Sequence, residues 1–297
     1  MRTRAEGILK NAGISYSCDV DISGISTLGV RCVAAFCVTP TSTDELVRTV
    51  HLLRGASIPY KVVGAMSNIA PSQNEYNGVI LNTRKLVGKT VADNVITAEC
   101  GVRLSDIVRT LSCFSLGGLE QLFHIPGRLG GSVRGNAGAH GLEISDVLTS
   151  ATVYFPDEDT TVVLGNDEMN FAYRTSILKD NGGILLSARL RAIPKSQTQI
   201  LADIEHYRAL RTNQPHGVRT LGSTFKRVDG VSAGYYIDKC GLKGIRIGDA
   251  EVSRVHAGFI INCGNATPDD IVCLISTVKM RVFEAFGITL EEEIDYL

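Results

Sequence analysis

The sequence predicts an α+β protein built from three regions, and three patterns along the chain support this fold class. Residues 1–85 carry a short apolar strand, an amphipathic helix and a second strand, in the order of a βαβ unit. Residues 86–195 read as several strands interrupted by one helix, and residues 196–297 contain amphipathic helices. The region boundaries are therefore expected near residues 85 and 195.

The first region begins with a strand at residues 34–40, after which Ser42 and Glu45 form a capping box. Apolar residues at helical spacing follow, and a glycine ends the helix. A second strand, residues 60–63, runs into a loop from Gly64 to Asn68. Because ligands favour the carboxyl ends of strands in α/β units, this loop is a candidate binding segment.

The later regions are defined by strand and helix signals. Strands are predicted at residues 79–82, 94–98, 147–155, 160–164 and 183–191, with a helix near residues 104–111. In the third region, helices are predicted around Ile200, at 231–240 and from Thr267-Pro268 to Phe286. Residues 288–297 begin as a strand, and such a strand has to pair with an existing sheet.

Composition limits the classes of function. The 30 basic and 31 acidic residues nearly cancel, so no global field would attract nucleic acid or an anionic membrane. The start lacks the apolar stretch of a secretory signal and no later run is long enough to span a bilayer, which favours a cytoplasmic protein. Eight scattered cysteines without a CxxC pair favour reduced structural thiols, and no metal site is predicted.

The stretch IPGRLGGSVRGNAGAHG, residues 125–141, holds six glycines and is the most informative part of the chain. Glycine permits close approach of the backbone to a ligand and positive φ, so we interpret the stretch as binding a flat or phosphorylated molecule. The alternative is a mobile glycine loop. Ile125, Leu129 and Val133 recur every four residues, which favours an ordered, partly buried turn of helix.

Polar groups elsewhere could supply chemistry, because neither a GxGxxG after a strand nor a GxxxxGK[ST] motif is present. Arg174 in YRTS could hold a carboxylate, or form only a surface salt bridge. Ser223 in GSTFK could donate a proton beside two cations, or lie in a plain turn. Glu291–Glu293 could be functional or form a solvated tail.

In sequence order these pieces resemble one family, the UDP-N-acetylenolpyruvoylglucosamine reductases, also called UDP-N-acetylmuramate dehydrogenases. The strings IPGxxGGxVxxNAGAxG, FxYRxSI and GSTFK carry the resemblance, which spans about residues 26–293 and looks like the shorter branch of the family. It implies an FAD-binding region of the vanillyl-alcohol-oxidase type in two parts, residues 1–85 and 86–195. It also implies an α+β substrate-binding domain over residues 196–297.

The implied activity belongs to peptidoglycan precursor synthesis. NADPH would reduce FAD and leave, and the enolpyruvyl sugar nucleotide would then take a hydride from flavin N5 to give UDP-N-acetylmuramate. The resemblance implies a cytoplasmic enzyme with a small-molecule substrate, and we expect a monomer that binds neither nucleic acid nor membrane.

The resemblance also assigns residues. Ser223 matches the proton donor, and Arg174 and Glu293 match the groups that polarise the substrate carboxylate. Matched cofactor-binding positions are Gly64, Ser67, Asn68, Pro126, Gly127, Gly130, Gly131, Asn136, Ala137, Gly138 and Gly141. Substrate-binding candidates are Tyr173, Gln214, Lys226 and Arg227, followed by Lys243 and Arg254.

Several positions depart from the family pattern. Arg31 and Cys32 stand where two glycines are usual, and Met66 replaces a glycine of the first loop. We expect their bulk to hinder positive φ and to weaken or reshape flavin binding. Further departures are Glu251, Gly258 and Asp295. They leave two alternatives, a non-catalytic or weakly flavin-binding relative and another flavin oxidase of the same superfamily.

Overall fold

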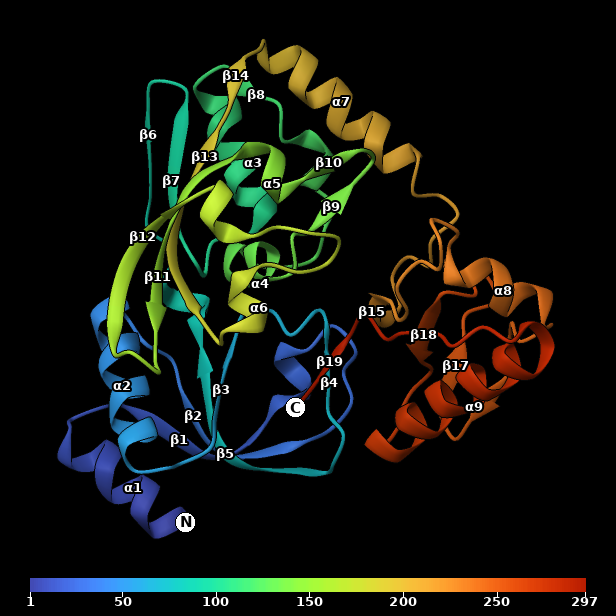
Figure 1. The fold of residues 1–297 in the computed structure, drawn as a ribbon, viewed down its shortest axis with the longest axis horizontal. Coiled ribbons are helices and arrows are strands. Elements are labelled where there is room, and N and C mark those ends of the chain that lie inside the picture. The colour runs from blue at the N-terminus through green and yellow to red at the C-terminus, as the bar shows by residue number, and fades with distance from the viewer. The chain divides into compact units, whose positions relative to one another are not determined.

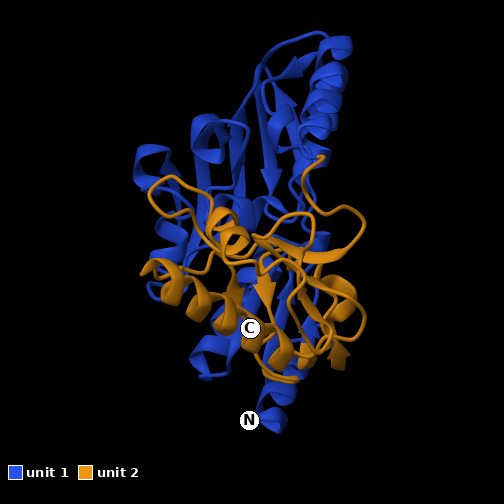
Figure 2. Ribbon diagram, turned by 90° about the vertical axis from the view of Figure 1, so that its right-hand side faces the viewer, with its two compact units in different colours: residues 1–17, 37–64, 78–211 blue, residues 18–36, 65–77, 212–297 orange.

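The computed structural model describes residues 1–297, and the chain divides into two compact units whose segments alternate along the sequence (Figure 2). Unit 1 consists of residues 1–17, 37–64 and 78–211. Unit 2 consists of residues 18–36, 65–77 and 212–297. Neither unit is a continuous piece of the chain. No helix is long and apolar enough to cross a membrane.

The amino-terminal part of the chain forms a four-stranded sheet in the order β1-β2-β5-β3 (Figure 1). Its strands are β1 (Tyr16–Asp21), β2 (Val33–Val38), β5 (Glu75–Asn82) and β3 (Tyr60–Val63). In unit 1, β3 runs parallel to β5, with Tyr60 opposite Val79. The connecting helix α2 (Thr43–Gly55) is capped by Ser42, whose side chain accepts a hydrogen bond from the Glu45 amide. The other half of the expected capping box does not form, because Glu45 Oε2 accepts from the Thr41 amide instead. Helix α1 (Arg2–Asn11) packs against α2.

A five-stranded antiparallel sheet forms the larger part of unit 1. In sheet order its strands are β12 (Thr160–Gly165), β11 (Leu148–Phe155), β13 (Ile184–Arg191), β7 (Val95–Glu99) and β6 (Lys89–Ala92). Helix α3 (Leu104–Cys113) buries Leu104, Ile107 and Leu111, as its helical spacing requires. The helix and the strands expected at residues 94–98, 147–155, 160–164 and 183–191 are thus confirmed. The strand expected at residues 79–82 forms as well, but it belongs to β5 of the amino-terminal sheet.

Short elements complete unit 1 and surround the glycine-rich stretch. They are η2 (Thr83–Lys85), β8 (Leu116–Gly117), η3 (Glu120–Leu122), α4 (Leu129–Arg134), β9 (Gly138–Ala139), β10 (Leu142–Glu143), α5 (Ile144–Val147), η4 (Asp167–Met169), α6 (Ile177–Asp180) and β14 (Ile193–Pro194). Helix α7 (Gln197–Ala209) follows and ends just before the chain enters unit 2 (Figure 1). Most of these elements are too short for sequence periodicity to reveal.

Unit 2 has a second antiparallel sheet, on which the long helix α9 (Pro268–Phe286) packs (Figure 1). The sheet order is β15 (Arg219–Ser223), β18 (Phe259–Asn262), β17 (Ala250–Val252) and β16 (Arg246–Ile247). Smaller elements are η1 (Ile22–Ile25), β4 (Ile69–Ala70), α8 (Ala233–Lys239) and β19 (Asp295–Tyr296). The core of this unit also takes in Leu28, Val30 and Ala70, which lie far away in sequence.

The predicted strand starting at residue 288 is wrong in its position. Only β19, Asp295–Tyr296, is a strand there, and it pairs parallel with β4. Upstream, Glu292 forms an isolated antiparallel bridge with Phe225. This part of the chain therefore pairs first with Phe225 and then with β4, so no single strand forms over its full length. The expectation that it pairs with existing structure is confirmed.

Candidate active site

The glycine-rich stretch of unit 1 is ordered. Helix α4 buries Leu129 and Val133 completely, which confirms the expected helical turn. Backbone hydrogen bonds of 2.8 Å from the amides of Leu129 and Gly130 to the carbonyls of Val102 and Cys100 fix it to the preceding segment. The mobile-loop alternative is therefore not supported.

Individual glycines in this stretch serve different purposes. A Cβ atom at Gly130 would lie 3.3 Å from Cys100 Cβ, and one at Gly138 would lie 2.7 Å from Glu143 Cγ. These two glycines are needed by the packing of the chain itself. A Cβ atom at Gly131 meets nothing within 4 Å, so the backbone there borders open space. That space is where a bound molecule could approach the main chain.

Asn136 holds the second half of the stretch together. It is buried, has φ of +40°, and donates through Nδ2 to Glu143 Oε2 at 2.7 Å and to the Ala172 carbonyl at 3.2 Å. Its Oδ1 accepts from the Ser145 amide. Because both amide hydrogens of Asn136 are used within the chain, its side chain shapes the loop rather than presenting donors to a ligand.

Arg174 lies next to this loop, as the candidate site requires. Its Nη1 is 3.4 Å from the Asn136 carbonyl and its Nη2 is 3.5 Å from the Gly138 carbonyl, with Glu143 Oε1 3.9 Å away. The residue has φ of +60°, a left-handed conformation that is strained for a side chain of this size. The guanidinium of Arg174 is thus placed beside this loop by a strained backbone conformation.

Gly64, from the first predicted binding loop, is adjacent to the glycine-rich stretch. A Cβ atom at Gly64 would lie 3.1 Å from Cβ of Arg128. Arg128 itself donates from Nη1 to the Gly101 carbonyl. Two segments that sequence analysis selected separately, the end of β3 and the stretch from residue 125, therefore meet in unit 1.

The departures from the family pattern have clear structural roles in unit 2. Met66 is 2% exposed with φ of +45°, and its carbonyl accepts from Ser26 Oγ at 3.4 Å. The expectation that methionine prevents positive φ here is wrong. Arg31 is exposed, with Nε 3.5 Å from Asp21 Oδ2. Cys32 is buried, and that burial raises the pKa of its thiol to about 11, which makes it a neutral core residue.

Ser223, Asn68 and Glu293 lie on connected backbone segments of unit 2. The Glu293 amide donates to the Thr224 carbonyl at 2.9 Å, and Asn68 Nδ2 donates to the Glu293 carbonyl at 3.0 Å. The Asp295 amide in turn donates to the Asn68 carbonyl. Ser223 is exposed at the end of β15. The first loop, the GSTFK segment and the terminal glutamates therefore converge although they are far apart in sequence.

Two of the terminal glutamates, Glu291 and Glu292, have different side-chain partners. Glu291 forms an ion pair with Lys226, a substrate-binding candidate. Glu292 is held by Lys279 Nζ at 2.7 Å, and burial together with a hydrogen bond to Glu292 raises the pKa of Tyr296. The solvated-tail alternative is therefore wrong, and the structural role of Glu292 had no sequence signal, because its partners come from distant segments.

The remaining candidates are less closely gathered. Tyr173, Pro126 and Arg227 are exposed. Lys243 pairs with Asp238 at 2.8 Å and Arg254 with Glu251 at 3.2 Å, so both cations already have carboxylate partners. The other matched positions lie in loops or at loop edges and are partly or fully exposed: Ser67, Gly127, Ala137, Gly141 and Gln214.

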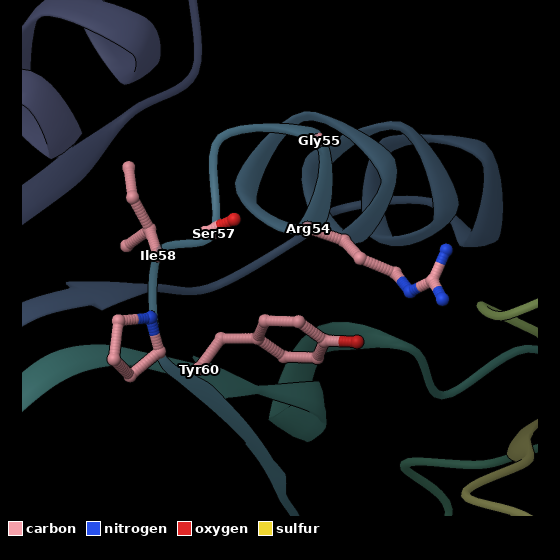
Figure 3. A pocket seen from close by; sticks show the side chains of 6 residues that line it. Arg54, Gly55, Ser57, Ile58 and Tyr60 are labelled. Atoms are coloured by element: carbon pink, nitrogen blue, oxygen red, sulfur yellow. The ribbon is translucent and has the colours of Figure 1, made fainter.

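No group of three or more histidine, cysteine or acidic residues is placed to hold a metal ion, and all eight cysteines are free. A surface depression at the end of α2 is lined by Arg54, Ser57, Ile58 and Tyr60, among others (Figure 3). It contains none of the candidate residues. Arg54 instead binds Asp157 Oδ1 at 2.6 Å, which favours a structural function for this surface.

The fold and the site define a flavin-dependent class of protein. The protein-family model described as "FAD binding domain" matches residues 34–164. A second family model, described as "UDP-N-acetylenolpyruvoylglucosamine reductase, C-terminal domain", matches residues 214–297. Relatives with this reductase name match the chain over nearly their full length. The chain belongs to the UDP-N-acetylenolpyruvoylglucosamine reductase family.

Three examples show the extent of the similarity. The reductase of Caldicellulosiruptor bescii is 39% identical over 296 residues, covering 98% of this chain and 94% of that protein. The reductase of Streptococcus suis is 37% identical and covers 96% and 95% of the two chains. The crystal structure of UDP-N-acetylenolpyruvylglucosamine reductase from Thermus caldophilus superposes with a TM-score of 0.79 at 30% identity, covering 95% of this chain and 98% of that one.

Proposed function

We propose that this protein reduces UDP-N-acetylglucosamine enolpyruvate to UDP-N-acetylmuramate, using FAD and NADPH, in peptidoglycan precursor synthesis. The observation that carries the proposal is the convergence of Ser223, Asn68 and Glu293 in unit 2. In unit 1, Arg174 lies against the glycine-rich stretch. Family membership supplies the reaction to which these groups are suited.

The residues present fit FAD. Gly131 borders open space, and buried polar atoms without a hydrogen-bond partner occur beside both loops, at Arg128 Nε and Thr27 Oγ1. The cofactor would be held by Gly64, Ser67 and Asn68 and by the stretch from Pro126 to Gly141, mostly through the backbone. The chemistry that FAD supplies when bound is hydride transfer from NADPH to the enolpyruvyl double bond through flavin N5.

Ser223 is assigned the proton transfer. Its hydroxyl would protonate the carbon next to the substrate carboxylate after hydride has arrived at the other carbon. A hydroxyl is a weak acid, but the carbanionic carbon that accepts its proton is strongly basic, and fixed proximity makes the transfer feasible. The backbone at this point is fixed to one neighbouring segment, since Ser223 pairs with Phe259 and the Thr224 amide donates to the Gly258 carbonyl.

Arg174 and Glu293 are assigned to the carboxylate of the substrate. A guanidinium offers two parallel donors to a carboxylate and stabilises the negative charge that develops on it. Glu293 would stabilise the protonated form of the resulting intermediate. Tyr173, Gln214, Lys226 and Arg227 are proposed to bind the diphosphate and uridine of the sugar nucleotide, and Lys226 would exchange Glu291 for a phosphate.

An anaerobic visible spectrum of Ser223→Ala tests the proposal. We expect the variant to bind FAD and to be bleached by NADPH at the wild-type rate, while turnover of the enolpyruvyl sugar nucleotide falls at least 10³-fold, roughly the loss expected for a general acid. Ser223→Thr, which keeps a hydroxyl, should retain part of the activity. A wild-type protein that takes up no FAD would favour the non-catalytic relative, and unchanged turnover by Ser223→Ala would remove the assigned role.

The setting of the reaction is also a proposal. Eight free cysteines suit a reducing compartment, which supports the cytoplasm. The near-zero net charge of −1 gives no reason to expect nucleic acid as a partner. We further propose a monomer and a functional division into residues 1–85 and 86–195 for FAD and 196–297 for the substrate. Light scattering of the holoenzyme, alone and in complex with the sugar nucleotide, would test whether the protein is a monomer.

A further inference from the structure

Arg128 has a buried nitrogen that nothing in the chain satisfies. Its Nη1 donates to the Gly101 carbonyl, but Nε is buried and has no hydrogen-bond partner. The side chain forms no ion pair with a carboxylate within the distance of a salt bridge. A guanidinium nitrogen that is withdrawn from water without an acceptor is unfavourable, and an anion would supply the missing acceptor.

The surroundings of Arg128 are positive as well. Arg103 is paired with it across an isolated antiparallel bridge, and Arg84 lies close enough to act on its charge. Burial and these two cations lower the pKa of Arg128. The carboxylate that opposes them, Asp106, is also engaged by Arg109 at 3.4 Å. The Cys100 thiol, the other titratable group acting on Arg128, is buried with a raised pKa of about 12 and stays neutral.

The position of Arg128 identifies the anion. A Cβ on Gly64 would lie only 3.1 Å from the Cβ of Arg128, and Arg128 immediately precedes α4 with Gly130 and Gly131. Arg128 thus stands between the two glycine segments that would hold the cofactor. A guanidinium presents several donors in a fixed fork, a geometry that matches the oxygens of a diphosphate.

We propose that Arg128 is a further cofactor-binding residue that contacts the diphosphate of FAD through Nε and a second guanidinium nitrogen. Arg84 and Arg103 add a favourable field without direct contact. This inference rests on the proposed function, because it takes FAD as the ligand. It differs from that function in assigning charge-based recognition to a loop that otherwise offers only backbone groups.

Binding of FAD by Arg128→Met and Arg128→Lys, followed by flavin fluorescence over a series of salt concentrations, tests the inference. We expect Arg128→Met to raise the dissociation constant of FAD at least 10-fold at low salt and to flatten its salt dependence. Arg128→Lys keeps the positive charge but loses the forked set of guanidinium donors. Its dissociation constant for FAD should lie between those of the wild type and Arg128→Met. The matched control is Arg109→Met, an exposed arginine nearby, which should bind FAD like the wild type.

The thermal midpoint of the FAD-free protein separates a ligand role from a structural one. The half-buried guanidinium of Arg128 has only the Gly101 carbonyl as a hydrogen-bond partner. Removing it should therefore leave that midpoint unchanged or raise it, and inorganic pyrophosphate should raise the wild-type midpoint more than that of Arg128→Met. A lowered midpoint with unchanged FAD affinity would overturn the inference, since Arg128 would then only brace Gly101. Equal responses to pyrophosphate would also overturn it.

The two proposals fail in different ways. If the wild type binds FAD and turns over the enolpyruvyl sugar nucleotide while Arg128→Met binds FAD equally well, only the role of Arg128 is lost. If the wild type itself takes up no FAD, the proposed function and this inference are lost together.

Discussion

At the scale of single residues, the loop of unit 1 is shaped by two left-handed side chains. Asn136 and Arg174 both have positive φ, and the carbonyl of the first accepts from the guanidinium of the second. Asparagine tolerates this left-handed conformation better than most non-glycine residues. Arginine rarely adopts it. The strain at Arg174 persists because Asn136 fixes the surrounding loop through Glu143, Ala172 and Ser145.

Asn136→Ala should therefore destabilise unit 1. The change removes the donors to Glu143 and Ala172, leaves the Ser145 amide without its acceptor and puts alanine at positive φ. We expect a loss of about 2–4 kcal/mol in the free energy of unfolding, measured by urea titration. Asn136→Gly removes the same bonds without the strain and should be less destabilised by roughly 1 kcal/mol. Equal values for the two variants would contradict the conformational part of the argument.

At the scale of elements, helix α4 presents two neighbouring glycines with opposite surroundings. Gly130 faces Cys100, whereas Gly131 faces open space. Gly130→Ala should lower the thermal midpoint of the FAD-free protein, since Cys100 has to move. Gly131→Ala should leave that midpoint unchanged or raise it, because alanine favours a helix by about 1 kcal/mol over glycine.

The same pair of variants reports on the cofactor. If the space beside Gly131 receives FAD, Gly131→Ala should weaken FAD binding by about tenfold or more, a loss of roughly 1.4 kcal/mol. Isothermal titration of FAD into the apoprotein measures this directly. Wild-type affinity in Gly131→Ala would show that the backbone of α4 does not approach the cofactor closely.

The terminal segment is a second element with a defined task. Glu292 is anchored by Lys279 on α9 and by Tyr296, so the backbone at Glu293 is set between Thr224 and Asn68. Glu292→Gln should lower kcat by roughly 10-fold, because small displacements of a reacting group are costly, while FAD affinity stays unchanged. The control is Glu284→Gln, which changes an exposed residue of α9, the helix that carries Lys279. This variant should have wild-type kcat. Stopped-flow turnover with saturating substrate distinguishes the two.

How much the sequence could predict differs between these elements. Helix α9 was predictable end to end, since Thr267, Pro268 and Gly287 are local signals for its start and stop. β4 and β19 were not, because two-residue strands carry no period and form only through pairing across the chain. The roles of Ser223, Arg174 and Glu293 followed from the family resemblance, and stay proposals. The structural work of Asn136 and Glu292 depends on tertiary partners that no local pattern reveals.

At the scale of the whole molecule, unit 2 cannot be cut from the chain as its last segment. Its core contains Leu28, Val30 and Ala70, and Asn262 Nδ2 donates to the Leu28 carbonyl at 3.1 Å. Residues 212–297 produced alone would expose that surface and lose the pairing of β19 with β4. We expect this fragment to lack a cooperative thermal transition and to show poorly dispersed amide resonances, in contrast to the full chain. A sharply melting fragment would contradict this prediction.

The bond between Asn68 and the Glu293 carbonyl spans 225 positions of sequence. On a ribosome that adds about 5–20 residues per second, the loop at Asn68 waits roughly 10–45 s for that partner. During this interval β4 presents an unpaired edge, and the buried surface of Ala70 has no cover from the later segments of its own core. The newly made chain is thus open to aggregation and to chaperone capture at the place where Asn68, Ser223 and Glu293 later come together.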